Sequence, residues 1–312
     1  MNTAGADKVN KPSNFVQSIS RIFSDGDMES ARKLILHSGV WQQGLFSAYG
    51  QSQQSRLWVN WLGKCGLSAV EHCETLSYGG SKTAFLCELR PEKSQSTVRI
   101  LFCISHNESH IKQVNMLTDT NLLAQALDTS TDDIKAWWPN PDPLVICDYD
   151  HQIHLETFHA KPSDMLSGYQ GHSHSQLLNQ WWEIWQRMQF SHINALYAEN
   201  AQVFLPGKAE AQNSSALFSY CSTLIMGLER HYCQLTDIII DSDCNTKMLV
   251  NWYLEGDYRP SNSSAGSVQM QSRVRMCFSS ILQIKDNKIQ SEVLLFDQCA
   301  FQKQFPACHL AM

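Results

Sequence analysis

The most constraining feature of this sequence is a segment near its end that has a near-copy far upstream. Lys288–Asp297 reads as a strand that ends in an aspartate, a residue able to cap a following helix. Ile289 and Asp297 match Ile111 and Asp119, which lie 178 positions earlier. A strand and a capped helix that occur twice predict that a whole structural unit is duplicated in the chain.

A second match points to the same duplication in a different register. His72 opens the pattern His-x3-Leu-Ser, and His231 opens His-x3-Leu-Thr, 159 positions later. The two offsets differ by 19 residues. We expect this additional chain in a Ser/Asn/Gly-rich stretch at residues 261–266, where it would form a longer hairpin loop.

The order of the predicted elements indicates the fold class. The chain has 312 residues, a length typical of two domains. Helical spacing of apolar residues comes first, as in Phe15–Phe23, and alternating segments such as Thr97–His106 follow. Helices followed by antiparallel strands predict an α+β fold. We expect one domain over residues 13–128, a connection with a small hairpin over 129–172, and a second domain over 173–306.

Composition narrows the classes of partner. The formal net charge is −6 and there is no run of Lys or Arg, which argues against binding to nucleic acid or to an anionic membrane surface. The first 14 residues are polar and do not resemble a secretory signal. The 11 cysteines form no C-x-x-C pair and fit reduced thiols. We therefore expect a cytoplasmic protein.

The predicted element order resembles the nuclear-transport-factor-2-like superfamily. The resemblance rests on an aromatic-rich helix, a helix that ends near His231, long strands, and the last strand with Ile289 and Asp297. Residues 174–306 resemble SnoaL-like domains, which include polyketide cyclases and relatives of scytalone dehydratase, and residues 13–128 resemble a more divergent copy. The resemblance implies two tandem cone-shaped domains, each a curved antiparallel sheet wrapped around its N-terminal helices with a pocket between them.

The resemblance also implies positions for catalytic groups. Cyclases of the family carry a histidine where this chain has Tyr258, and an aspartate on the last strand where it has Leu294. Cyclase chemistry would therefore lack two proton-transfer groups. Dehydratase-like members use a histidine at the position of His231, but the aspartate that they pair with it has no match within residues 187–194.

Three residues of the second copy are candidates for catalysis, and each has a structural alternative. His231 could be a general acid or base, or a half-buried histidine at a helix–strand junction. Glu292 shares strand parity with Leu294, so it could point into the cone as a base with a raised pKa, or lie at a solvent-exposed edge. Tyr258 could donate a hydrogen bond to a ligand or pack as an aromatic.

Apolar residues of the second copy are candidates for ligand contacts. The cluster Trp181, Trp182 and Trp185 predicts core packing of a helix more readily than a pocket. The expected contacts to a ligand are Trp252, Leu254, Met276, Phe278 and Leu294. The histidines at 151, 154, 159, 172 and 174 have no zinc-site spacing, and no metal is expected. Acid–base groups alone can move a proton, so no cofactor is expected either.

Three functions stay open at the level of sequence. The first is a small-molecule-binding protein whose ligand is apolar or aromatic. The second is a cofactor-independent dehydratase, isomerase or cyclase, and the third is a protein–protein interaction module. Family members often pair through their exposed sheet faces, so the two copies could form an internal pseudo-dimer, with a homodimer as a further possibility.

Overall fold

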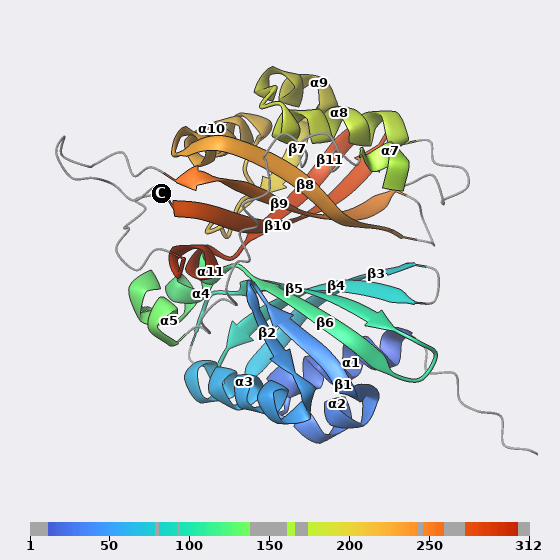
Figure 1. Ribbon diagram of the computed structural model, residues 1–312, viewed down its shortest axis with the longest axis vertical. Coiled ribbons are helices and arrows are strands. Elements are labelled where there is room, and N and C mark those ends of the chain that lie inside the picture. The colour runs from blue at the N-terminus through green and yellow to red at the C-terminus, as the bar shows by residue number, and fades with distance from the viewer. Residues whose placement is uncertain are drawn as a thin grey trace, which may run out of the picture.

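The computed structural model describes residues 12–78, 81–92, 94–137, 161–165, 174–241, 246–258 and 272–304. The protein is α+β, as the sequence predicts, with two sheets that each carry their own helices (Figure 1). We call residues 12–137 the first region and residues 174–304 the second region. The predicted hairpin in the connection, the 261–266 loop and the histidines at 151, 154, 159 and 172 lie outside the described residues.

The first region begins with helices that lie against one face of its sheet. Its elements are α1 (Pro12–Ser24), α2 (Met28–Leu34), β1 (Ile35–Gln43), β2 (Phe46–Tyr49), α3 (Gly50–Cys65), β3 (Ser68–Tyr78), β4 (Lys82–Pro91), β5 (Val98–His106), β6 (Ile111–Thr118), α4 (Thr120–Ala126) and α5 (Thr131–Trp137).

The second region repeats this plan with longer strands. Its elements are α8 (Ser175–Gln186), η2 (Phe190–His192), α9 (Ile193–Leu196), β7 (Tyr197–Phe204), α10 (Ser214–Met226), β8 (Leu228–Ile240), β9 (Lys247–Tyr258), β10 (Ser272–Lys285), β11 (Lys288–Phe296) and α11 (Gln298–Gln302), and a short helix, α7 (Pro162–Met165), precedes them.

The two sheets share one strand order, apart from β2, which adds a sixth strand at one edge of the first sheet. The first runs β2-β1-β6-β5-β4-β3 and the second β7-β11-β10-β9-β8. In each, the strand after the helices pairs in parallel with the last strand, β1 with β6 and β7 with β11, whereas the other neighbours are antiparallel. β1 is preceded by α1 and α2 as β7 is by α8 and α9. This common topology supports the duplication that the sequence predicts.

The matched aspartates occupy the same place in both regions. Asp119 accepts a hydrogen bond from the backbone N–H of Leu122 (3.0 Å) at the start of α4, and Asp297 accepts one from Ala300 (2.9 Å) at the start of α11. A carboxylate at this position satisfies an N–H group that has no partner within the helix. The two caps therefore fix equivalent positions in β6 and β11 for comparison.

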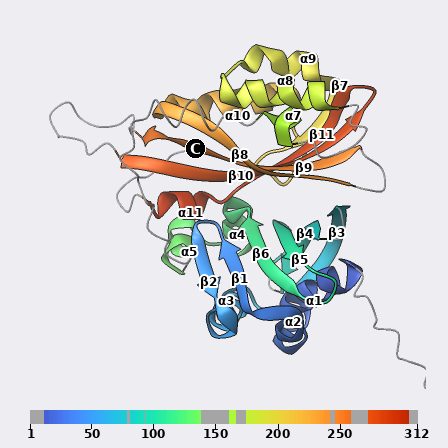
Figure 2. The ribbon, with the colours of Figure 1, turned by 45° about the vertical axis from the view of Figure 1, so that its right-hand side comes forward.

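Successive side chains along each strand lie on opposite faces of the sheet. One face packs against the helices of the same region, and the other faces the opposite sheet. Inner-face residues and helices form one apolar core in each region. Leu86, Leu101, Leu249, Ile281 and Leu295 belong to a third core made of outer-face residues of both sheets. Figures 1 and 2 show these faces packed together with most of the helices on the outside. The chain thus contains the internal pairing of sheet faces that the sequence suggests.

Reciprocal polar contacts surround this third core. Lys82 of the first region pairs with Asp237 of the second at 2.6 Å, and Lys247 of the second pairs with Glu74 of the first. Each lysine stands at the start of an equivalent strand, β4 or β9. Such exchange of the same contact in both directions is typical of an interface with two-fold symmetry.

Asp297→Ala is expected to destabilise the protein by about 1 kcal/mol, because α11 loses its cap. Thr120 of the first region also donates a hydrogen bond to Asp297 (3.3 Å). Asp297→Asn keeps the capping oxygen and should retain most of the stability. Urea unfolding midpoints measure both effects, and equal midpoints for Ala and wild type would contradict the role of the cap.

No helix in the described part of the chain is long and apolar enough to cross a bilayer.

Candidate functional site

A buried carboxyl group lies inside the core of the second region. Glu292 stands on β11 and has no exposed surface. Leu294 and Phe296 on the same strand belong to the inner core, whereas Val293 and Leu295 face the other sheet. Glu292 therefore points inward with Leu294, as their shared parity indicates. A carboxyl group in such a place is unusual, because burial of a charge is costly unless it is paired.

Tyr197 is the hydrogen-bond partner of Glu292. β7 runs parallel to β11, and the Tyr197 hydroxyl donates to Glu292 Oε2. Glu292 Oε1 has no hydrogen-bond partner among the described residues. The indole N–H of Trp181 has no partner that meets hydrogen-bond geometry either. Trp181 and Ser280 lie close enough to Glu292 to lower its pKa, but Oε1 has no partner with hydrogen-bond geometry, so the site combines one satisfied carboxyl oxygen with one that has only neutral dipoles nearby.

The surroundings of Glu292 favour its neutral form. Burial raises the pKa of Glu292 from 4.5 to about 7, and the neighbouring Tyr197, Ser280 and Trp181 lower it only in part. Burial also raises the pKa of Tyr197 well above 10, with the nearby Glu292 adding to the effect. Near neutral pH the carboxyl can therefore be either a hydrogen-bond donor or a base, while Tyr197 stays a neutral hydroxyl that donates to it in this structure.

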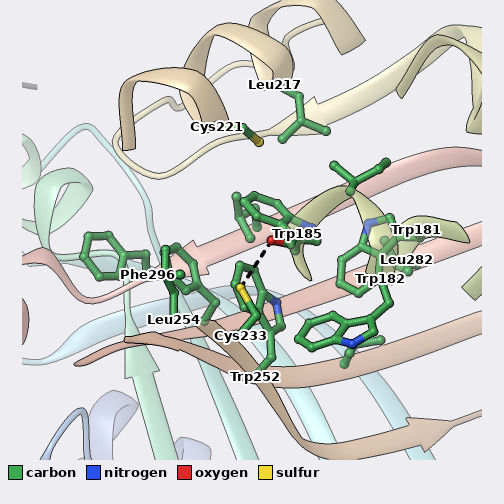
Figure 3. Packing of buried hydrophobic residues seen from close by; sticks show 14 of the residues in the cluster. Trp181, Trp182, Trp185, Leu217, Cys221, Cys233, Trp252, Leu254, Leu282 and Phe296 are labelled. Carbon is green, nitrogen blue, oxygen red and sulfur yellow. Dashed lines mark hydrogen bonds between the residues drawn. The ribbon is translucent and has the colours of Figure 1, made fainter. Parts of the chain in front are cut away.

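Aromatic rings fill the rest of this core. Trp252 contacts Trp185 at a centroid distance of 4.5 Å and stacks on Phe278 at 4.4 Å. Trp181 lies 6.5 Å from Trp252 in an edge-to-face arrangement. Figure 3 shows these rings packed beneath α10, whose Leu217 and Cys221 point toward them. The buried Cys233 thiol donates a hydrogen bond to the carbonyl oxygen of Trp185 (3.4 Å), which ties β8 to α8.

The first region has apolar residues at the positions of this polar group. Val114 and Glu292 both lie five residues before the capping aspartate, and Ile35 pairs with Ile111 as Tyr197 pairs with Ile289. Val114 and Ile35 are buried in the core of the first region. The same backbone can thus be packed without a carboxyl or a hydroxyl at these positions.

The position of Ser280 shows the same difference between the regions. Leu294 and Met116 are equivalent, because each lies five positions after the matched isoleucine, Ile289 or Ile111. Ser280 is opposite Leu294, and Phe102 is opposite Met116, so Ser280 and Phe102 are equivalent as well. A large apolar ring in one core therefore corresponds to a small hydroxyl in the other. The indole N–H of Trp252 donates to Ser280 Oγ at 3.5 Å, so this hydroxyl belongs to the polar group around Glu292.

His231 lies far from Glu292 along the sheet. Tyr232, the residue next to His231, is opposite Glu255 on β9, and Glu255 is opposite Arg275 on β10. Glu292 is opposite Leu282, also on β10. Arg275 and Leu282 are seven residues apart on β10, which corresponds to roughly 23 Å at about 3.3 Å per residue. The structure does not bring His231 and Glu292 together, so the expected proton-transfer pair does not form in this structure. His231 is half-buried, with an Nδ1 atom that has no partner among the described residues.

Tyr258 belongs to the His231 end of the sheet. It is the last residue of β9, pairs with Leu228 and Ser272, and packs edge-to-face on Phe301. Its side chain is buried. Because strand register also separates it from Glu292, Tyr258 cannot share a small ligand with that carboxyl. The three catalytic candidates thus occupy two ends of one core.

The residues expected to contact a ligand are all buried members of this core, namely Trp252, Leu254, Met276, Phe278 and Leu294. Met276 also lines a cavity of about 10 Å³ between Gly44 and Phe301. This volume is roughly what one water molecule requires. All five side chains have at most 1% of their surface exposed, so a ligand could reach them only if the core opens, and their contact with a ligand stays a prediction.

Sequence reasoning missed two members of the site. Tyr197 and Ser280 meet Glu292 because β7 and β10 flank β11. β7 pairs with β11 in parallel, and Tyr197 and Glu292 are 95 residues apart along the chain, so no local pattern reveals their contact. Comparison of the two copies strand by strand would have exposed the change from Ile35 to Tyr197.

Metal ligands do not gather at this site. No group of three or more His, Cys, Asp or Glu side chains that could hold a metal ion occurs in the described ranges. His174 is described and lies at the start of α8.

Comparison with known proteins gives matches of fold. No family model matches the chain, and no curated protein matches it. A candidate polyketide cyclase from Acidithiobacillus ferrooxidans matches at 10% identity over 45% of this chain and 99% of its own, with a TM-score of 0.36. IdmH, a candidate polyketide cyclase from Streptomyces antibioticus, matches at 13% identity over 44% of this chain and 100% of its own, with a TM-score of 0.37. A SnoaL-like candidate polyketide cyclase from Jannaschia sp. CCS1 matches at 10% identity over 45% of this chain and 99% of its own, with a TM-score of 0.36.

A part of the chain is thus similar in fold to these candidate polyketide cyclases, one of which is described as SnoaL-like. This likeness concerns the fold alone and assigns no activity.

Tyr197→Phe is expected to destabilise the protein by about 1–3 kcal/mol, because Glu292 loses its hydroxyl donor inside the core. Tyr232→Phe is a matched control, since Tyr232 also donates to a buried glutamate, Glu255, which in addition has Arg275 as a partner. Guanidinium unfolding at pH 8 should show the larger loss for Tyr197→Phe. A larger loss for Tyr232→Phe would contradict the importance of the Tyr197 bond.

Proposed function

We propose that the second region binds a small, largely apolar molecule beside Glu292. The observation that supports this most directly is a fully buried carboxyl with an open oxygen, next to tryptophan rings. Buried polar groups in folded proteins nearly always have partners, so an open one calls for a functional explanation. A bound molecule with one polar group would supply the missing partner and bury its apolar part among the rings.

The first region supplies the internal comparison for this proposal. Its core is closed with Val114, Ile35 and Phe102 at the equivalent positions. An apolar triad therefore suffices for packing, whereas Glu292, Tyr197 and Ser280 together place polar atoms where the fold does not need them. We assign the binding role to the second region and a covering role to the first, whose sheet packs on the outer face of the second.

Access to Glu292 requires a movement, because the carboxyl has no exposed surface. α10 is the natural element to move, since it covers the tryptophan cluster and contains no charged residue to anchor it (Figure 3). Ser219, Ser222 and Thr223 of this helix donate their hydroxyls to backbone carbonyls one turn earlier. Opening would therefore break apolar contacts and leave the hydroxyl bonds of α10 intact.

Catalysis by Glu292 is a second candidate function. A carboxyl with a pKa near 7 can accept and return a proton at neutral pH, which suits a cofactor-independent isomerase or dehydratase. Such chemistry would use Glu292 with Tyr197 as a hydrogen-bond donor, without His231 or Tyr258. A protein-interaction module that uses its sheet face is disfavoured, because that face is already covered within the chain.

Thermal shift measurements with a panel of aromatic fragments test the binding proposal. We expect at least one fragment to raise the melting temperature of wild type and to have no such effect on Glu292→Val, which restores the packing of the first region. Glu199→Gln on the exposed side of β7 is the control and should respond as wild type does. Fragments that act equally on wild type and Glu292→Val would place binding elsewhere and contradict the proposal.

A further inference from the structure

Five acidic side chains are buried in the described residues, and four of them face positive charge or a helix start. The five are Asp119, Glu255, Asp257, Glu292 and Asp297. Buried charges in proteins are normally paired or otherwise compensated. The groups that compensate four of these carboxylates show which compensation the fifth, Glu292, lacks.

Arginines compensate the two buried acids on the outer face of β9. Glu255 pairs with Arg275 and, at 3.7 Å, with Arg273. Asp257 pairs with Arg230 and, at 3.3 Å, with Arg273. These guanidinium groups neutralise both carboxylates locally.

Helix starts compensate two further acids. Asp119 and Asp297 each accept a backbone N–H at the first turn of a helix, and Asp119 also accepts the N–H of Gly207 at 2.9 Å. Arg99 lies near Asp119 and favours its charged form, while burial raises the pKa of Asp119 to about 6. Backbone N–H groups at a helix start carry partial positive charge and stabilise a carboxylate.

Glu292 has none of these compensations. No ion pair joins it to a described residue, and the one buried arginine or lysine side chain among the described residues, Arg99, belongs to the first region. The titratable groups packed near it from other elements are Tyr197 on β7 and Cys221 on α10, and both stay neutral because burial raises their pKa well above the usual value. Trp181 on α8 and Ser280 on β10 contribute neutral dipoles.

We propose that the molecule bound beside Glu292 is a protonated organic amine, whose N–H group pairs with the open carboxyl oxygen and whose apolar substituent lies among the tryptophan rings. This inference rests on the proposed function and names the chemical class of its ligand. An anionic ligand is excluded, because the site offers it no cation. A neutral ligand would leave an ionised Glu292 without the arginine or helix-start N–H groups that each of the other four buried acids of the described residues has. Indole rings are also the best aromatic partners of cations.

The proposal makes the affinity depend on pH in a defined direction. Without ligand, burial favours the protonated carboxyl; a bound ammonium group takes the place of that proton. Binding of an amine should therefore release protons near pH 6–7 and become tighter as pH rises from 6 to 8. A neutral ligand that accepts a hydrogen bond from the protonated carboxyl would show the opposite slope.

Isothermal titration calorimetry with paired probes tests the inference. The probes are benzylamine, phenethylamine and tryptamine, each compared with its neutral alcohol, namely benzyl alcohol, phenethyl alcohol and tryptophol. We expect an amine to bind wild type more tightly than its alcohol at pH 8, and Glu292→Gln to weaken the amine at least about 30-fold. Glu199→Gln should bind as wild type does. Titration in two buffers of different ionisation enthalpy gives the number of protons released at pH 6.5.

The outcomes separate this inference from the proposed function. Alcohols that bind as tightly as amines, with loss of binding in Glu292→Val, would overturn the amine assignment and leave the binding role standing. Affinity for amines that falls from pH 6 to pH 8 would overturn it as well. An absence of Glu292-dependent binding by any probe, charged or neutral, would overturn both.

Discussion

Replacement of Glu292 by glutamine is expected to change the free energy of unfolding more favourably at pH 8 than at pH 5. In wild type the pKa of Glu292 is raised from 4.5 to about 7 by burial. A group with a raised folded pKa contributes stability that is fully present below its unfolded pKa and is lost as pH rises through the folded value. Wild type should therefore lose about 3 kcal/mol from this group between pH 4.5 and pH 8. The glutamine variant has no such proton to lose.

The measurement is the free energy of unfolding in urea at several pH values. The difference between Glu292→Gln and wild type should grow by about 2.5 kcal/mol from pH 5 to pH 8, whatever its sign at pH 5. Glu292→Val should show the same pH trend and test whether the packing of the first region suits the second. Glu199→Gln is the control for a general charge effect. Parallel pH curves for wild type and Glu292→Gln would show that the buried carboxyl does not titrate as described.

Trp252→Ala is expected to destabilise the protein by about 3–5 kcal/mol, the usual cost of a large aromatic truncation in a core. Trp252 is almost fully buried and contacts Trp181, Trp182, Trp185 and Phe278. If its role were mainly to contact a ligand in an open pocket, truncation would reduce binding with a much smaller loss of stability. Its position at the centre of a closed aromatic cluster predicts the larger structural effect.

Trp252→Phe serves as the matched variant, because it keeps a ring against Phe278 and removes the N–H that reaches Ser280. We expect it to cost less than half as much as the alanine variant. Differential scanning calorimetry gives both values under one condition. A loss below about 1 kcal/mol for Trp252→Ala would mean that the core can collapse around the missing indole, and the closed-core description would then be wrong.

The sequence by itself determined much of the fold. Periodic apolar residues predicted helices before antiparallel strands, and the match of Asp119 with Asp297 located two equivalent strand ends, which the structure shows as two caps. These features are local, because alternation, helical spacing and capping depend on residues close together in the chain. The parity that places Glu292 on the same face as Leu294 is local in the same sense.

The tertiary structure alone decided which residues meet Glu292. His231 was an attractive partner by residue type, but the number of strand residues between the two positions keeps them apart. Tyr197 is the actual partner because a parallel pairing of β7 with β11 brings together two residues that are 95 positions apart along the chain. Strand register over such separations is set by the packing of the whole sheet, to which no short pattern in the sequence corresponds.

Whether the aromatic rings fill the core of the second region was likewise decided by the tertiary structure. Composition showed that enough aromatic residues were present, but not whether they would line a cavity or fill it. The answer depends on how α8 and α10 lie against the curved sheet, and in this structure the tryptophan rings contact one another (Figure 3). Close packing excludes voids wherever side-chain volumes match the space between elements. The sequence therefore identified the carboxyl, and the fold decided that it is buried, uncompensated and closed off from solvent.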